Sequence, residues 1–226
     1  MSKAYFRFLN EENFNDDGNL YFETDFDFIE NHNLWSDYFL QTPTVDIANM
    51  HGLLRDNDYV LCVLYGNRLN DTFSDVQFAT SETAKYREKD INTLKRTLGE
   101  ELGLGLRTSR IPSEIKYGIV DRLVTIYSIN IRDTVLNSER GTVKTVEAPG
   151  SDDRFRKTAV CVYGNKRDIC SYLNNPNIFL DKSEDKIVGF VAVKFSDAKR
   201  YFNDNNTTGN TTWTNKEKRR RRRYFK

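Results

Sequence analysis

The chain has 226 residues, of which 38% are hydrophobic and 30% are charged, and its formal net charge is +1. This length and balance are typical of a soluble protein with one sizeable hydrophobic core, or of a domain with appendages. No apolar run approaches the roughly 20 residues of a membrane-spanning helix, which excludes a helical membrane protein.

Residues 1–41 are acidic and rich in aromatic side chains. The alternation of apolar and polar residues over 20–28 predicts an extended strand. Because so many large rings are disfavoured in water, we expect this segment to be a folded extension that packs on the main domain or on a partner. A free acidic and aromatic interaction arm is the alternative interpretation.

The predicted main domain covers residues 42–203. Val45–Leu54 and Tyr59–Tyr65 are two predicted strands, because the turn-forming residues 56–58 separate two apolar segments. The later elements are a short extended piece at Val76–Phe78, strands at Ile115–Val120, Leu123–Ile131, Ala159–Tyr163 and Ile187–Phe195, a loop at 142–157, and helices at Asp168–Asn174 and Asp197–Phe202. This mixture predicts an α/β fold in which helices flank a mixed sheet.

The cysteines and histidines give little sign of chemistry. Cys62, Cys161 and Cys170 are an odd number without metal-ligand spacing, so we expect buried, reduced thiols rather than disulfides. Together with the absence of an apolar secretory segment after the first residues, this predicts a cytoplasmic location. His32 and His51 stand alone, and His51 lies in an apolar run that predicts a core residue rather than a catalyst.

The most informative stretch is a predicted helix that begins near Asp90. Leu94, Leu98 and Leu102 recur, together with Ile91, at the spacing of a half-buried helix. Gly103 follows where a left-handed residue ends a helix. Glu100 and Glu101 then lie on the last turn beside the buried face. Because Mg²⁺ binds through one or two carboxylates, waters and substrate phosphates, this pair is a candidate cation site. A solvated helix face is the simpler interpretation of the same pair.

This stretch resembles the signature of the Nudix hydrolases. That signature reads Gly, five residues, Glu, seven residues, Arg-Glu, an aliphatic residue, any residue, Glu-Glu, any residue, Gly and an aliphatic residue. Glu88 is followed after seven residues by Arg96. The later positions are filled by Leu98, Glu100, Glu101, Gly103 and Leu104. Two positions depart from the signature, because Glu82 stands at the opening Gly and Thr97 at the Glu that follows the Arg.

The resemblance implies a Nudix-like α/β/α sandwich with a mixed sheet and a Mg²⁺- or Mn²⁺-dependent activity. It implies that Glu100 and Glu101 bind the metal and that Glu88 and Arg96 form a supporting ion pair. It also implies a further acid from a distant loop. Glu184 and Asp185 are the first candidates for this acid, and Glu147 is the second choice.

The two departures affect the implied metal site. Threonine has a hydroxyl but no charge, so the change at Thr97 weakens or removes one ligand. An ordinary side chain at Glu82 costs on the order of 1 kcal/mol if the backbone there is left-handed, so we expect the loop to be reshaped. Glu82 is also a candidate replacement carboxylate.

The end of the chain is strongly basic. Residues 216–226 hold eight basic residues and one acid, so this tail carries +7 and leaves −6 for the rest of the chain. Its core is the run Arg219, Arg220, Arg221, Arg222 and Arg223. Charge of this kind attracts the phosphates of RNA, and the aromatic residues on either side suit stacking on bases. We expect 204–226 to be a disordered tail; a purely solubilising role and a nuclear-import signal, which would give a nuclear location, are the other interpretations.

Two classes of function follow from these observations. The first is a metal-dependent pyrophosphohydrolase that cleaves a nucleoside diphosphate linked to another group, either a free nucleotide derivative or an RNA 5′ end or cap. The second is a catalytically inactive Nudix-fold protein that binds a nucleotide, RNA or a protein partner. The sequence does not predict the oligomeric state or the leaving group.

Overall fold

The computed structural model describes residues 2–9, 15–36, 40–67, 72–107, 113–119, 122–137, 156–178 and 186–207. The strands are β1 (Lys3–Phe8), β2 (Phe22–Asp25), β3 (Tyr59–Asn67), β4 (Thr72–Gln77), β5 (Thr80–Thr83), β6 (Leu104–Leu106), β7 (Ser113–Ile119), β8 (Arg122–Asn130), β9 (Thr134–Leu136), β10 (Arg156–Gly164) and β11 (Ile187–Lys194). The helices are α1 (Asp27–Asn31), α2 (Gln41–Met50), α3 (Asp90–Leu102), the short 3-10 helix η1 (Ile131–Asp133), α4 (Lys166–Leu173) and α5 (Phe195–Thr207).

The fold is a mixed α/β structure built on one large mixed sheet. Its strand order is β2-β1-β11-β3-β10-β8-β7, with β4 paired to β3 and β5 paired to β10. β8 and β10 are parallel, whereas the other pairs of this sheet are antiparallel. β6 and β9 form a separate two-stranded sheet. The structure therefore confirms the predicted α/β class and the mixed sheet.

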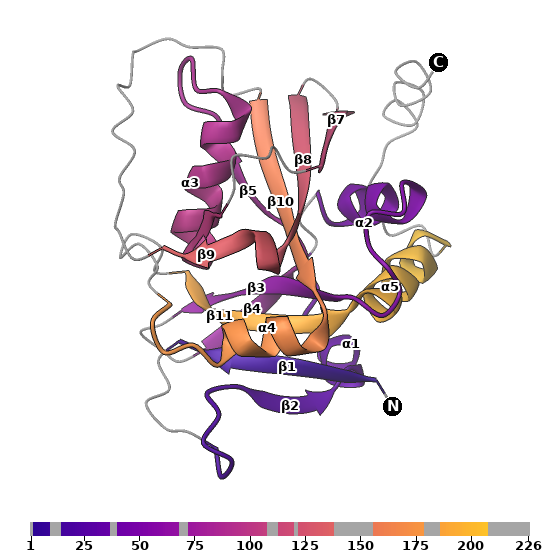
Figure 1. The fold of residues 1–226 in the computed structure, drawn as a ribbon. Helices are drawn as coiled ribbons and strands as arrows, with labels where there is room; N and C mark the ends of the chain where they lie inside the picture. Colours follow the sequence, from indigo (N-terminus) through magenta and orange to yellow (C-terminus); the bar gives the residue numbers. More distant parts are fainter. Residues whose placement is uncertain are drawn as a thin grey trace.

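The large sheet has two parts, which meet where β3 pairs with β10. β5 pairs with Lys157–Val160 of β10, and β3 pairs with Val162–Gly164 on the same edge of that strand. In Figure 1 the part containing β5, β10, β8 and β7 runs across the part containing β4, β3, β11, β1 and β2. α3 lies beside β5 and β10 and contacts both strands. The end of α3 consequently lies close to the junction of the two parts.

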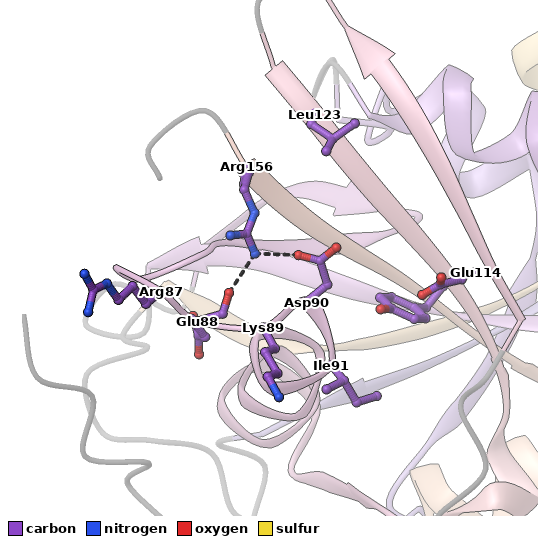
Figure 2. Close-up of a pocket in the computed structure, with 9 residues that line it drawn as sticks. Arg87, Glu88, Lys89, Asp90, Ile91, Glu114, Leu123 and Arg156 are labelled. Carbon is purple, nitrogen blue, oxygen red and sulfur yellow. Dashed lines mark hydrogen bonds and ion pairs between the residues drawn. The ribbon is translucent and has the colours of Figure 1, made fainter. Parts of the chain in front are cut away.

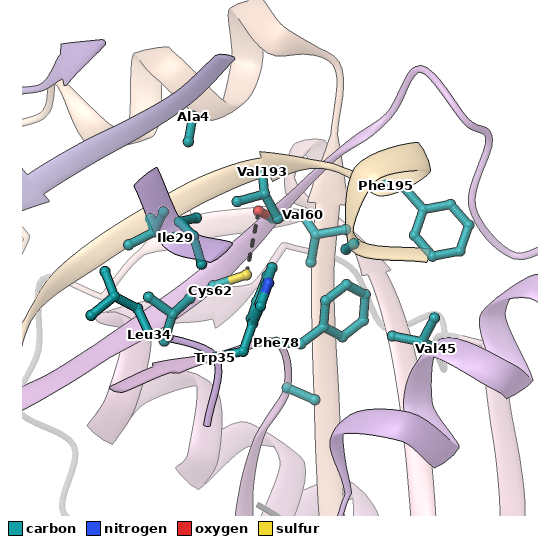
Figure 3. Packing of buried hydrophobic residues seen from close by; sticks show 14 of the residues in the cluster. Ala4, Ile29, Leu34, Trp35, Val45, Val60, Cys62, Phe78, Val193 and Phe195 are labelled. Atoms are coloured by element: carbon teal, nitrogen blue, oxygen red, sulfur yellow. Dashed lines mark hydrogen bonds between the residues drawn. The ribbon is translucent and has the colours of Figure 1, made fainter. Parts of the chain in front are cut away.

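Strand β3 shows how the core is divided. Val60, Cys62 and Leu64 belong to one buried cluster, shown in Figure 3, whereas Leu61 and Val63 belong to another. Successive side chains of a strand point to opposite faces, so β3 is buried on both sides. The first cluster includes side chains of α1, α2 and α5, and the second includes side chains of α3 and α4. Helices thus cover both faces of the sheet.

The segment 1–41 contributes directly to this sheet. β1 pairs with β2 on one side and with β11 on the other. The approach of β1 to β11 is close at Gly189, where a Cβ atom would lie 2.1 Å from the carbonyl oxygen of Arg7. Phe6 is 1% exposed and Phe26 is fully buried. These two rings are therefore part of the core.

The predicted strand Val45–Leu54 is wrong, because most of it belongs to helix α2. The segment was predicted as a strand because it is apolar and precedes the turn-forming residues 56–58. The buried residues Leu40, Thr44 and Ala48 recur instead at the four-residue spacing of a helix. Pro43 lies in the first turn, where a missing backbone N–H is tolerated.

The other predicted elements correspond to observed ones, and their described ends agree or differ by at most five residues. The largest difference is at α5, which continues to Thr207, beyond the predicted end at Phe202. The exception is the predicted loop 142–157, whose last two residues belong to β10 and whose remainder lies outside the described residues. Cys62, Cys161 and Cys170 are buried free thiols, as predicted. His51 was predicted to be a core residue, and this is wrong, because it is an exposed residue at the end of α2.

Candidate functional site

Helix α3 carries the candidate site and ends as predicted. Leu94 and Leu98 are fully buried, and Leu102 is 1% exposed. Gly103 adopts φ 62° and ψ 29°, and its N–H bonds to the carbonyl oxygen of Gly99 at 3.2 Å. A left-handed backbone conformation at this position is most easily adopted by glycine. The helix is therefore fixed along its apolar face and ends at its last leucine, with Gly103 as the C-cap.

Arg96 is the centre of a cluster of carboxylates. Its side chain is 6% exposed, and the Glu88 side chain is 1% exposed. Nε and Nη2 of Arg96 donate to Glu88 at 3.3 and 3.2 Å, and Nη2 also donates to the carbonyl oxygen of Thr83 at 2.8 Å. Nη1 donates to Glu82 at 2.9 Å and to Glu100 at 3.3 Å. A planar guanidinium with five N–H donors can make this set of bonds at one time.

The pKa values of this cluster follow from burial and pairing. Burial acts to raise the pKa of Glu88, but the bonds from Arg96 and from the Lys85 N–H outweigh it, and the pKa is lowered. Burial acts to lower the pKa of Arg96, but Glu88 and Glu82 outweigh it, and the pKa is raised. Glu88 and Arg96 therefore remain a charged pair that connects the loop before α3 to the middle of the helix.

Glu100 and Glu101 have different surroundings. The Glu100 side chain is 32% exposed, and burial raises its pKa despite the nearby Arg96. Glu101 is 5% exposed and accepts a hydrogen bond at 2.7 Å from the hydroxyl of Tyr65, at the end of β3. The hydroxyl of Thr80, at the start of β5, donates to the same oxygen of Glu101. Neither glutamate extends into bulk solvent, so the simple solvated helix face does not describe this pair.

The two departures from the signature have clear structural roles. Thr97 is fully buried, and its hydroxyl donates to the carbonyl oxygen of Thr93 at 2.9 Å. Glu82 lies within β5, paired with Thr158, and has no left-handed backbone. Glu82 therefore has no left-handed backbone strain, and its carboxylate joins the ion pairs of Arg96.

Several features of the site were not predicted from the sequence. Tyr65 and Thr80 hold Glu101, although they are distant from it in the chain. Among the described non-glycine residues, Asn33 and Arg87 have positive φ, and Arg87, at 56°, lies in the loop that leads into α3. No spacing rule indicates which hydroxyls meet a given carboxylate, because this depends on how β3 and β5 approach the helix.

The structure does not assemble a complete metal centre from the residues it describes. Within that part of the chain, no group of three or more His, Cys, Asp or Glu side chains is placed to hold a metal ion. The predicted further acids Glu147, Glu184 and Asp185 lie outside the described residues. The same is true of the predicted nucleic-acid contacts Arg219, Arg220, Arg221, Arg222 and Arg223.

Comparisons with protein-family models, with curated proteins and with solved structures give no match for this chain. None of the helices in the described ranges has the length and apolar character needed to cross a bilayer. The functional conclusions below therefore depend on the chemistry of the site and on the motif in the sequence.

Proposed function

We propose that the protein is a divalent-metal-dependent pyrophosphohydrolase of the Nudix type, with a Nudix-like α/β/α sandwich. The substrate class is a nucleoside diphosphate linked to another group, either a free nucleotide derivative or the 5′ end or cap of RNA. The observation that carries the proposal is the buried Glu88–Arg96 pair, with N···O distances of 3.2 and 3.3 Å. The resemblance implied this pair, and it joins the loop before α3 to the helix that carries the paired glutamates.

The paired glutamates meet the modest demands of Mg²⁺ or Mn²⁺. Mg²⁺ keeps several waters and takes one or two carboxylates together with substrate phosphates. Glu100 and Glu101 supply carboxylate oxygens of this kind at the end of α3. The described residues fit such an ion, held largely by water and substrate, better than they fit an ion enclosed by protein ligands. A bound ion would neutralise phosphate charge and acidify a water.

The chain's own groups would then orient the reaction. The Tyr65 and Thr80 hydroxyls both donate to Oε2 of Glu101, which fixes the direction of this carboxylate. Glu100 lies beside Glu101 on the last turn of α3 and would hold the ion together with it. Arg96 holds Glu100 at 3.3 Å and sets its position relative to Glu101.

The test is hydrolysis of a substrate panel in Mg²⁺ or Mn²⁺. ADP-ribose, dinucleoside polyphosphates, nucleoside triphosphates and capped RNA represent the substrate class. Glu101→Gln keeps the size of the side chain and removes its charge, so we expect loss of turnover by about 100-fold or more. Glu23→Gln is the matched control, because the Glu23 side chain lies on β2 and is 45% exposed. Equal rates for the two variants would refute a catalytic role for Glu101.

A catalytically inactive Nudix-fold protein that binds a nucleotide, RNA or a protein partner is the second candidate. Thr97 favours it, because its hydroxyl is buried and bonded to Thr93 where the signature has a charged Glu. Titration calorimetry with Mn²⁺ separates the two candidates. Metal binding with turnover supports the hydrolase, whereas the lack of both supports the binding protein.

A further inference from the structure

A hollow of about 520 Å³ lies between the start of α3 and strands β7, β8 and β10 (Figure 2). Its size falls within the range of roughly 300 to 1,000 Å³ that is usual for sites that bind small ligands. Glu88 is its one lining residue that also belongs to the Arg96 cluster. The hollow is therefore a separate site beside the paired glutamates.

One wall of the hollow is cationic. Arg156 donates from Nη2 to Oδ1 of Asp90 and to the carbonyl oxygen of Glu88, both at 2.6 Å, and Figure 2 shows these two bonds. Arg156 thus balances the charge of Asp90, while Arg96 balances the charge of Glu88. Lys89 and Arg87, both exposed, add two further cations on the loop side of the hollow.

The opposite wall is aliphatic and ends at an acid. Leu123 on β8 is 45% exposed, and Ile91 on α3 is half-buried. Tyr127 lies beneath them and is 1% exposed. Burial raises the pKa of Tyr127, and a hydrogen bond to the exposed Glu114 raises it further. Because a carboxylate has about four acceptor positions, Glu114 can accept further bonds while it holds this hydroxyl.

We propose that this hollow (Figure 2) binds one nucleotide unit, with its phosphate at Lys89 and its base on Leu123 and Ile91. Glu114 accepts a hydrogen bond from an amino group on the edge of the base, as carboxylates do with cytosine. This inference rests on the proposed function for the expectation that the ligand is a nucleotide. The hollow would hold a part of that ligand that Glu100 and Glu101 do not contact.

The nucleotide unit has two sources, a free nucleotide or an RNA chain. Asp90 and Glu100 are ten residues apart on α3, which is about 15 Å at 1.5 Å per residue. The hollow and the paired glutamates therefore lie toward opposite ends of α3 and are connected through Glu88, Arg96 and Glu100. An RNA chain with one nucleotide in the hollow and its 5′ end at Glu100 and Glu101 spans both.

The test measures binding of AMP and of a short oligoadenylate to the full-length protein in EDTA, where hydrolysis is suppressed. Lys89→Ala removes the phosphate contact, and Lys95→Ala is the matched control, because Lys95 is an exposed lysine of α3 that does not line the hollow. We expect Lys89→Ala to weaken binding about fivefold, as suits a charge-assisted contact open to water, and Lys95→Ala to leave it unchanged. Melting temperatures confirm that both variants are folded.

The outcomes assign the source of the nucleotide. Weaker binding of both ligands by Lys89→Ala indicates that free nucleotide enters the hollow, and weaker binding of the oligonucleotide alone indicates an RNA chain. Equal effects of Lys89→Ala and Lys95→Ala on both ligands would overturn the proposal. In the wild type we expect CMP to bind more tightly than UMP, whose ring has the same size but no amino group, and Glu114→Ala to remove the difference. A difference that persists in Glu114→Ala overturns the assigned role of Glu114. Because these readouts need no metal, a lack of hydrolysis does not affect them.

Discussion

Replacing Arg96 by methionine should strongly destabilise the protein, because it leaves a buried carboxylate without its partner. The Glu88 side chain is 1% exposed, whereas the side chains of Glu82 and Glu100 are 26% and 32% exposed. Partly exposed ion pairs contribute up to about 1 kcal/mol each. Loss of the partner of a buried charge costs roughly 3 to 5 kcal/mol. We therefore expect Arg96→Met to lower the free energy of unfolding by about 3 kcal/mol or more.

Urea unfolding followed by circular dichroism measures this change. The double variant Arg96→Met with Glu88→Gln removes the stranded charge, while the glutamine oxygen can still accept from the Lys85 N–H, which bonds to Glu88 at 2.8 Å. We expect it to recover at least about 1 kcal/mol relative to Arg96→Met alone. Arg132→Met is the control, because the Arg132 side chain is 66% exposed and its bridge to Asp168 should contribute less than about 1 kcal/mol. A loss below about 1 kcal/mol for Arg96→Met, or no recovery in the double variant, would refute this reasoning.

Three further predictions concern pH, the end of the helix and the thiols. Because the pKa of Glu88 is lowered, its carboxylate stabilises the fold at pH values above the ordinary pKa of 4.5, and this stabilisation is lost as the pH falls through the folded-state pKa. Glu88→Gln should therefore flatten the acid limb of a plot of melting temperature against pH. Gly103→Ala should destabilise by about 1 kcal/mol, because φ is 62°, and an unchanged urea midpoint would contradict this. Burial raises the pKa of Cys62 and Cys161, so neither should react with a thiol reagent in native protein, and labelling that precedes unfolding would show the core to be open.

The sequence predicted helix α3 well, because several independent signals agree there. Three leucines at helical spacing mark its buried face, and Gly103 marks its end. The strands around it were predicted from runs that are buried on both faces, such as β3. Helix α2 was missed, because periodicity alone does not distinguish a short apolar run in a strand from one in a buried helix. The helical signal there came from Leu40, which lies before the segment that was taken as a strand.

The candidate site was predicted only in part. The Glu88–Arg96 pair was implied by the resemblance to the Nudix signature, which covers one loop and the helix that follows it. The contacts of Glu101 with Tyr65 and Thr80 depend on how β3 and β5 approach the helix, and sequence spacing holds no record of that. Glu82 was expected to strain the backbone, but it lies in a strand, where any side chain is accommodated. The tail and the distant acids lie outside the described residues, so their predicted roles stay predictions.

The position of β11 has a consequence for synthesis of the chain. β11 lies between β1 and β3, both of which are made much earlier. Until Ile187–Lys194 leaves the ribosome, β1 and β3 each present an open hydrogen-bonding edge, and open edges promote aggregation. A nascent chain that stalls before this strand should therefore require a chaperone, and a premature stop codon there should yield an insoluble product.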